Sequence, residues 1–144
     1  MPEENYLEVW PAHFASFMEL PRDHPIDMLN LVRFRETALY PAGHDRSGSG
    51  LSGAQAWAIY TEQSFPSFAR AGGTIVWSAT MESMLIGPVA ENWSISFVAR
   101  YSNAQAFLQS ITDQDYTDAL VHRQAALETS RLICLKPYEA ARGG

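Results

Sequence analysis

Cysteine and clustered basic residues are scarce in this sequence. The single cysteine, Cys134, cannot form an internal disulfide, and its apolar, strand-like surroundings favour a small buried hydrophobe over a nucleophile. Ten Lys and Arg residues stand against sixteen Asp and Glu residues, a formal net charge of −6 spread along the chain without blocks. Nucleic acids and anionic membrane surfaces bind clustered positive charge, so neither is an expected partner.

Long apolar spans are also missing. No stretch is long and uncharged enough to predict a transmembrane helix, and the acidic N-terminus lacks the apolar core of a signal peptide. We therefore expect a cytoplasmic protein that has no membrane partner.

The common cofactor and catalytic signatures are absent as well. The four histidines, His13, His24, His44 and His122, are far apart, and no pair has metal-ligand spacing with a carboxylate. The glycines of residues 42–53 are not followed by Gly-Lys-Ser/Thr, and there is no dinucleotide fingerprint and no nucleophile elbow. We predict no cofactor and no metal.

The sequence does contain the pattern of one folded domain. With 144 residues, 47% of them hydrophobic, the chain can bury a core of its own. Residues 26–35 are apolar nearly throughout, which predicts a strand covered on both faces. Asn30 interrupts this run on the face of Met28, Val32 and Phe34. If its amide is buried, it needs a partner, either in the protein itself or in a ligand that occupies a cavity.

Apolar spacing divides the rest of the chain into further elements. We expect a short helical piece within residues 1–20, with Pro11 in its first turn, and a helix over 54–71 that kinks or restarts at Pro66. Strands are expected over 74–86, 93–101 and 130–136. Ser102 and Gln105 form a capping box that opens one helix, and another follows over 115–128. Residues 43–53 are expected to form a mobile surface loop, or alternatively a lid.

The order strand, helix, strand, strand, helix, strand is that of a ferredoxin-like β-α-β-β-α-β fold, an α+β antiparallel sheet with helices on one face. Residues 1–144 then form one domain, with a helical extension over 1–25 and the core over 26–137. The other sheet face is expected to carry Trp, Phe, Met, Ser and Asn side chains, too large a patch to leave in water. We therefore predict a homodimer whose sheets pack face to face.

Several stretches together resemble the DUF1330 family of the dimeric α/β-barrel superfamily. They are Pro25-x-x-Met28-Leu29-Asn30-Leu31-Val32-Arg33-Phe34-Arg35 with Ala38 and Tyr40, then Gly72-Gly73, Asp115-Tyr116 and the run from Arg123 to Ile133. The similarity extends over residues 20–137 and implies a dimeric α/β barrel without naming a reaction. Family members often carry Pro-Glu-Tyr or a similar turn before the last helix. This chain has Gln114-Asp115-Tyr116 at that turn. Any role of the glutamate in the family's Pro-Glu-Tyr turn therefore cannot be assigned to Gln114.

Aromatic and polar residues supply a candidate ligand site. Aromatic walls and a few polar points, as in a pocket for a small organic molecule, come from Asn30, Tyr60, Trp77, Trp93, Ser94, Ser96 and Tyr116. An anionic group at the rim could be held by Arg33, Arg35, His122 and Arg123. Alternatively the aromatics form the core and a dimer interface, and the arginines pair with surface carboxylates.

These residues leave more than one function open. The first is binding of a small organic metabolite, anionic or aromatic, by Asn30, Arg33, Tyr60, Trp77, Trp93, Tyr116 and Arg123. The second is cofactor-independent catalysis, monooxygenase- or isomerase-like by analogy of fold, in which Asn30 or His122 handles a proton or an oxyanion. The third is a non-catalytic dimeric scaffold, which a solid interior would favour and a cavity reached by His122 would not.

Overall fold

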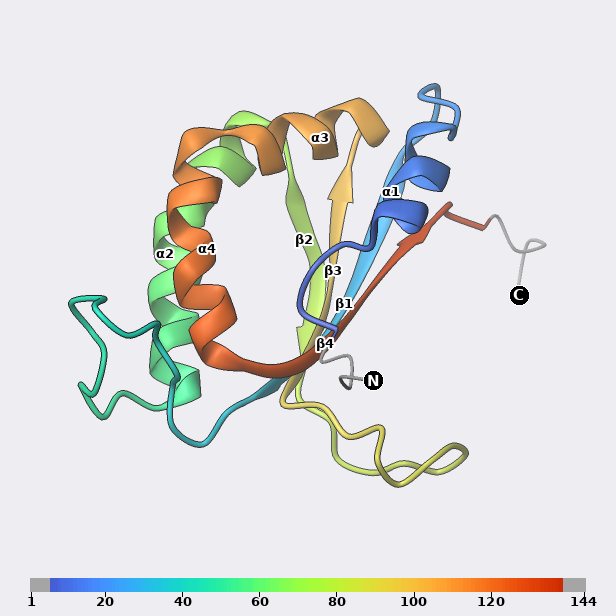
Figure 1. The fold of residues 1–144 in the computed structure, drawn as a ribbon. Helices are drawn as coiled ribbons and strands as arrows, with labels where there is room; N and C mark the ends of the chain where they lie inside the picture. The colour runs from blue at the N-terminus through green and yellow to red at the C-terminus, as the bar shows by residue number, and fades with distance from the viewer. Residues whose placement is uncertain (1–5, 139–144) are drawn as a thin grey trace.

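The computed structural model describes residues 6–138 of the chain. Within them the elements are α1 (Pro11–Met18), β1 (Ile26–Phe34), α2 (Gly53–Arg70), β2 (Thr74–Ala79), β3 (Ile95–Tyr101), α3 (Ala104–Thr112), α4 (Gln114–Ala126) and β4 (Leu127–Leu135). After α1, this is the predicted β-α-β-β-α-β order with its second helix divided into α3 and α4. Figure 1 shows α2, α3 and α4 arching over one face of the sheet.

The strands form one antiparallel sheet in the order β2-β3-β1-β4. The central strand β1 pairs with β3 on one side and β4 on the other, so that Asn30 stands opposite both Phe97 and Leu132. This strand order is that of a ferredoxin-like fold, and the predicted α+β class with helices on one face is confirmed. The sheet of a single chain is open, with β2 and β4 as its edges.

Two apolar clusters hold the helices against the sheet. One gathers Ile26 of β1 with Phe107 of α3. The other gathers Val32 of β1 with Trp57 of α2 and Leu127, the first residue of β4. Ile26, Val32 and Leu127 are almost completely buried, and burying an aliphatic side chain of this size contributes about 1.5–3 kcal/mol. Strand β1 therefore anchors both clusters, one toward each end.

The register decides which face of the sheet each side chain occupies. Met28, Asn30 and Val32 point toward the helices, because Met28 and Val32 belong to the clusters that the helices cover. The uncovered face carries Leu29, Leu31, Trp77, Ile133 and Leu135. The predicted placement of Asn and Met side chains on the uncovered face is therefore wrong for Asn30 and Met28. Since β1 is apolar on both faces, alternation alone does not tell which face the helices cover.

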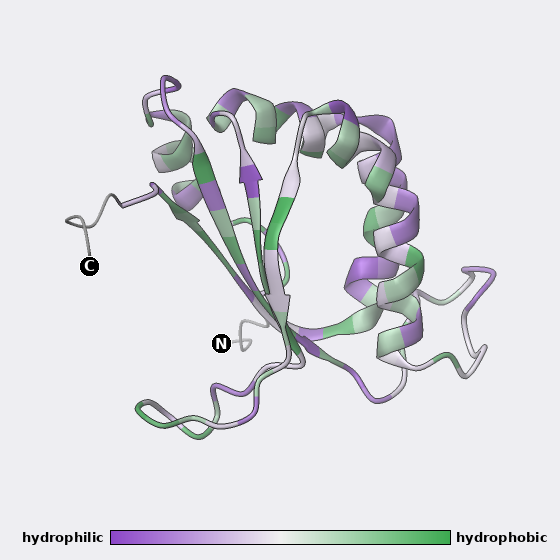
Figure 2. Cartoon of the chain, turned by 180° about the vertical axis from the view of Figure 1, so that it is seen from behind, coloured by the Kyte–Doolittle hydropathy of each residue, from purple (hydrophilic) through white to green (hydrophobic). Residues whose placement is uncertain are grey.

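Strand β2 is shorter than predicted. It ends at Ala79 instead of residue 86, and residues 80–94 form a long connection to β3. Leu85, Ile86 and Val89 in this connection are almost fully exposed. Figure 2 shows hydrophobic stretches at the tip of this connection, well away from the helices.

Two helix details refine the expectation. Helix α2 does not restart at Pro66 but continues through it, because this proline lies on the exposed side, where water can satisfy the carbonyl that it leaves unpaired. Helix α3 is capped by Asn103, whose side chain accepts a hydrogen bond from the Ala106 N–H at 2.9 Å. The predicted cap, Ser102, lies one residue too early, and Asn and Ser serve equally well at this position.

The N-terminal segment begins its helix at Pro11, in agreement with the prediction. Residues 1–5 of the predicted helical piece lie outside the described residues. None of the helices within residues 6–138 is long and apolar enough to cross a membrane.

Candidate functional site

A large pocket of about 1030 Å³ lies between the sheet and the helices that cover it. Its sheet wall comes from all four strands, mainly through their helix-facing side chains, and its other walls come from α2, α3 and α4. Residues 6–20, which we call the strap, run across it and contribute Tyr6 to Val9 and part of α1 to its lining. The volume is that of a site for a molecule of several rings.

Aromatic side chains form a large part of the pocket wall. Trp57 and Tyr60 of α2 lie with their ring centroids 4.9 Å apart. Phe68 and Phe107 each meet the ring of Tyr101 edge to face, at 5.6 and 5.4 Å. Aromatic rings in such arrangements offer flat apolar surfaces to a flat ligand.

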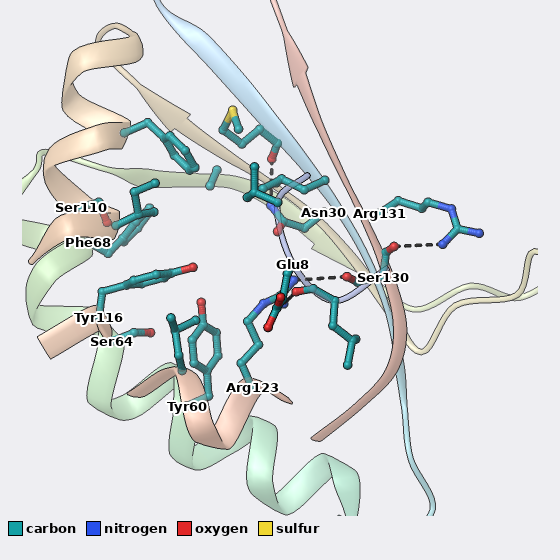
Figure 3. A pocket seen from close by; sticks show the side chains of 18 of the residues that line it. Glu8, Asn30, Tyr60, Ser64, Phe68, Ser110, Tyr116, Arg123, Ser130 and Arg131 are labelled. Atoms are coloured by element: carbon teal, nitrogen blue, oxygen red, sulfur yellow. Dashed lines mark hydrogen bonds between the residues drawn. The ribbon is translucent and has the colours of Figure 1, made fainter. Parts of the chain in front are cut away.

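Three polar side chains come together on the helix side of this pocket. Tyr60 of α2 and Tyr116 of α4 lie with ring centroids 6.4 Å apart, and Arg123 of α4 lies beside them (Figure 3). Burial raises the pKa of Tyr60 well above the usual range of a phenol, the neighbouring Tyr116 raises it further, and the positive charge of Arg123 opposes both effects. Tyr60 therefore stays protonated and can donate a hydrogen bond.

Burial also raises the pKa of Tyr101 to about 12, although a polar contact with the Ser110 hydroxyl opposes this shift. Tyr101 is thus a second phenol in the pocket wall that keeps its proton at physiological pH.

Asn30 faces the three polar side chains from the sheet wall. Its side-chain amide donates to the Met28 carbonyl at 3.1 Å, and Figure 3 shows the half-buried side chain directed into the pocket. By register its neighbours on that wall are Phe97 and Leu132. Asn30 is consequently a polar point within an apolar surface.

Arg123 ties the strap to the pocket. Its Nη1 donates to the Leu7 carbonyl at 2.8 Å, and its Nη2 donates to the Ser130 hydroxyl at 3.3 Å. That hydroxyl in turn donates to the Tyr6 carbonyl at 2.6 Å. Among residues 6–138 no carboxylate lies within ion-pair distance of Arg123. The guanidinium thus makes no direct ion pair in the described part of the chain, although the Glu8 carboxylate lines the same pocket.

The strap itself is lightly packed. None of the residues of α1 is buried, and Trp10 and Phe14, which line the pocket, keep more than a third of their surface exposed. Phe17 contacts Phe107 edge to face at 5.4 Å. A segment with few buried side chains opens at a low cost in free energy, so we expect a ligand to enter the pocket past the strap.

Three of the predicted site residues lie elsewhere. Arg33 donates to the backbone carbonyls of Ala90 and Asn92 in the β2–β3 connection. Trp93 of that connection lies under the guanidinium groups of Arg33 and Arg131. Trp77 is on the uncovered sheet face, because an irregularity between Ile75 and Trp77 shifts the alternation of β2. The prediction that these three join Asn30 in one cavity is therefore wrong.

His122 also lies outside the pocket. Its buried ring hydrogen-bonds through Nδ1 to the Tyr40 hydroxyl at 2.7 Å, and the ring of His44 packs against both. Burial lowers the pKa of His122, and the charges of Arg46 and His44 lower it further. These contacts belong to the segment that joins β1 to α2. The predicted catalytic role of His122 at the pocket thus has no geometric basis.

The remaining polar candidates, Ser94, Ser96 and Arg35, do not line the pocket. The Ser94 hydroxyl accepts a hydrogen bond from the Phe34 N–H at 3.0 Å, and Ser96 faces the uncovered side of the sheet by register with Leu31. The Arg35 Nε is buried without a partner among the described residues. Within residues 6–138 no group of three His, Cys, Asp or Glu side chains could hold a metal ion.

The sequence-based prediction missed several pocket residues. Ser64 lies four residues after Tyr60 and four before Phe68, so helical spacing alone places it on the same face of α2. Ser130 and Ser110 also line the pocket. Glu8, which accepts a hydrogen bond from the Gln124 side chain at 3.2 Å, had no signal in the sequence, because its place depends on the path of the strap.

Comparison with known proteins gives one close and several distant similarities. No family model matches the chain, and no curated protein matches it. The crystal structure of RPA0582, a protein of unknown function from Rhodopseudomonas palustris, shares 43% identity and a TM-score of 0.86 over 95% of this chain and 100% of that one. The structure of methylated RPA0582 gives the same identity and a TM-score of 0.87 over 96% and 98%.

A distant similarity concerns SnoaB, a cofactor-independent oxygenase from Streptomyces nogalater. It shares 12% identity and a TM-score of 0.52 over 83% of this chain and 98% of SnoaB, which shows a common fold. Identity of 43% over nearly the whole of both chains shows more, and this chain belongs to the family of the Rhodopseudomonas palustris RPA0582 protein.

Proposed function

We propose that the protein binds a flat organic anion in the pocket between the sheet and its helices. The observation that supports this most directly is Arg123, a cation that faces an aromatic pocket without a carboxylate partner in the described residues. The ligand-binding residues of the proposal are Asn30, Tyr60, Tyr116 and Arg123. Membership of DUF1330 stays part of the proposal, since the residues that carry that resemblance include Asn30 and Arg123.

Physical chemistry favours an anion at this position. A hydrogen bond to a charged group contributes about 1.5–3 kcal/mol, more than a neutral one. Burial raises the pKa of Tyr60, so its phenol keeps the proton. It can therefore donate a second hydrogen bond to a negatively charged ligand oxygen. The aromatic walls supply the rest, at about 25 cal/mol for each Å² of apolar surface that the ligand buries.

Calorimetric titration with 2-naphthoate and its neutral analogue 2-naphthamide tests the proposal. We expect 2-naphthoate to bind and 2-naphthamide to bind at least about tenfold more weakly, since the charge-assisted bond is lost. Arg123→Gln should remove this difference. Arg70→Gln is the matched control, because Arg70 pairs with Asp113 and Asp115 at the surface, outside the pocket. Equal binding of the two compounds to the wild type would overturn the proposal.

Cofactor-independent catalysis is a second candidate function for the same pocket. Arg123 and the Tyr60 phenol lie where they would stabilise the enolate or phenolate that such chemistry requires. SnoaB, described as a cofactor-independent oxygenase, has the same fold. The test is solvent-deuterium exchange into 2-tetralone, followed by NMR, in which solvent accepts the C–H proton as the enolate forms and D2O then delivers a deuteron to the same carbon. Wild-type protein that gives no more exchange than Arg123→Gln would exclude this function for an enolisable ketone.

We also propose a homodimer through the uncovered sheet face. Trp77, Ile133 and Leu135 on this face each expose 40% of their surface or more, and an apolar patch of this kind favours a self-complementary contact. Two such sheets face to face would form the dimeric α/β barrel. Light scattering at micromolar concentration should give twice the chain mass, and Trp77→Asp should give the monomer. If the wild-type protein is a monomer, the proposed barrel is wrong, and so is the third candidate function, a dimeric scaffold.

A further inference from the structure

We infer that Asn30 makes this pocket selective for hydroxylated aromatic carboxylates, which place a hydroxyl against Asn30 while their carboxylate meets Arg123. This inference rests on the function proposed above and deepens it by naming the ligand class. It assigns Asn30 as the residue that decides specificity.

The first step concerns the orientation of the Asn30 amide. Its nitrogen donates to the Met28 carbonyl of the same strand at 3.1 Å. Because the amide is planar, this bond turns the carbonyl oxygen away from the backbone of β1. Figure 3 shows the side chain extending from the sheet into the pocket. Asn30 therefore presents a hydrogen-bond acceptor to a bound molecule.

The second step concerns the surroundings of that acceptor. Phe97 and Leu132 lie beside Asn30 in register, and Met28 and Val32 precede and follow it on the same face of β1. These side chains cannot donate a hydrogen bond. A ligand that fills the pocket and excludes water thus leaves the Asn30 oxygen unpaired unless the ligand itself carries a donor.

The third step concerns the opposite wall. Arg123 is a donor only, and the phenol of Tyr60 keeps its proton because burial raises its pKa. These groups come from α2 and α4, across the pocket from β1. The site thus has donors on its helix wall and an acceptor on its sheet wall. A flat molecule that satisfies both has an anionic or carbonyl oxygen at one end and a hydroxyl at the other.

Such an arrangement discriminates strongly. A site that hydrogen-bonds a ligand hydroxyl rejects the analogue that lacks it, because the buried polar group of the protein loses its partner. We expect roughly tenfold or more in affinity for this single contact, which corresponds to about 1.4 kcal/mol.

Titration calorimetry with three rigid probes tests the inference: 2-naphthoate, 6-hydroxy-2-naphthoate and 6-methoxy-2-naphthoate. The methoxy compound keeps the oxygen and removes the donor. In the wild type the hydroxy compound should bind about tenfold more tightly than either of the others. In Asn30→Leu this advantage should disappear and 2-naphthoate should bind more tightly than it does to the wild type, because its binding no longer leaves a buried Asn30 oxygen unpaired. Asn92→Leu, on the exposed β2–β3 connection, is the matched control and should behave like the wild type.

The outcomes separate the inference from the function beneath it. If the three probes bind wild-type protein equally but still depend on Arg123, the selectivity assigned to Asn30 is wrong and the proposed anion site stands. If the methoxy compound binds as well as the hydroxy compound and better than 2-naphthoate, Asn30 acts as a donor and the inference is overturned. If no naphthoate binds, the proposed function fails and the inference fails with it. Asn30→Ala, which keeps no large side chain, replaces Asn30→Leu if the latter does not fold.

Discussion

Loss of the Ser130 hydroxyl should open the strap. This group donates to the Tyr6 carbonyl at 2.6 Å and accepts from the Arg123 Nη2 at 3.3 Å. A neutral hydrogen bond contributes about 0.5–1.5 kcal/mol and one to a charged group about 1.5–3 kcal/mol. Because Arg123 retains its bond to Leu7, we expect Ser130→Ala to cost the closed strap about 1–2 kcal/mol, roughly a tenfold increase in the open population.

Hydrogen exchange of the α1 amides measures this opening. In Ser130→Ala the amides of residues 14–18 should exchange about tenfold faster, while those of β1 change little, because opening of the strap is local. Ser110→Ala is the matched control, since Ser110 is a buried serine that also lines the pocket but makes no hydrogen bond to residues 6–20 within the described chain. Unchanged α1 exchange in Ser130→Ala, or an equal change in Ser110→Ala, would refute the role of this hydroxyl as a latch.

Three further predictions concern the frame of the site. A Cβ at Gly53 would collide with the Arg35 carbonyl and lie 2.7 Å from the carbonyl of Ala126, so Gly53→Ala should lower the free energy of urea unfolding by about 3 kcal/mol; a loss under about 1 kcal/mol would contradict the contact. Because burial lowers the pKa of His122, wild-type stability should fall as pH drops below about 6.5, and His122→Gln should lose less stability over the same interval. Residues 45–50 should exchange amide hydrogens faster than residues 56–60 of α2; equal protection would show that the glycine-rich loop is not mobile.

The fold was predictable because its signals are local. Apolar alternation in β3 and helical spacing in α2 and α3 are properties of short stretches, and their order implies the ferredoxin-like topology. The face of a strand is a different matter. β1 has Met28 and Val32 on one side and Leu29 and Leu31 on the other, so its sequence is nearly symmetric. Only the packing of Met28 and Val32 against the helices decides that Asn30 belongs to the pocket.

The same limit explains the misplaced site residues. Regular alternation would place Trp77 on the same face as Ile75, but the register shift between them places them on opposite faces. On α4, Tyr116 and Arg123 are seven residues apart, which is two helical turns and one face. His122 is one residue from Arg123 and hence about 100° away around the helix, where it meets Tyr40 instead.

The path of the strap could not be predicted, because it depends on contacts between residues more than a hundred positions apart, such as Leu7 with Arg123. This contact bears on how the site works. A guanidinium has five N–H donors in a fixed plane, and the described contacts use one on Nη1 and one on Nη2. Three donors remain for a ligand, so the strap orients Arg123 without blocking it. Because Arg123 is already oriented before the ligand arrives, binding costs less conformational entropy. In Ser130→Ala the strap opens more often, so 2-naphthoate should associate faster and dissociate faster than with the wild type. Because Arg123 is also less well oriented, the dissociation rate constant should rise by more, and the affinity for 2-naphthoate should fall.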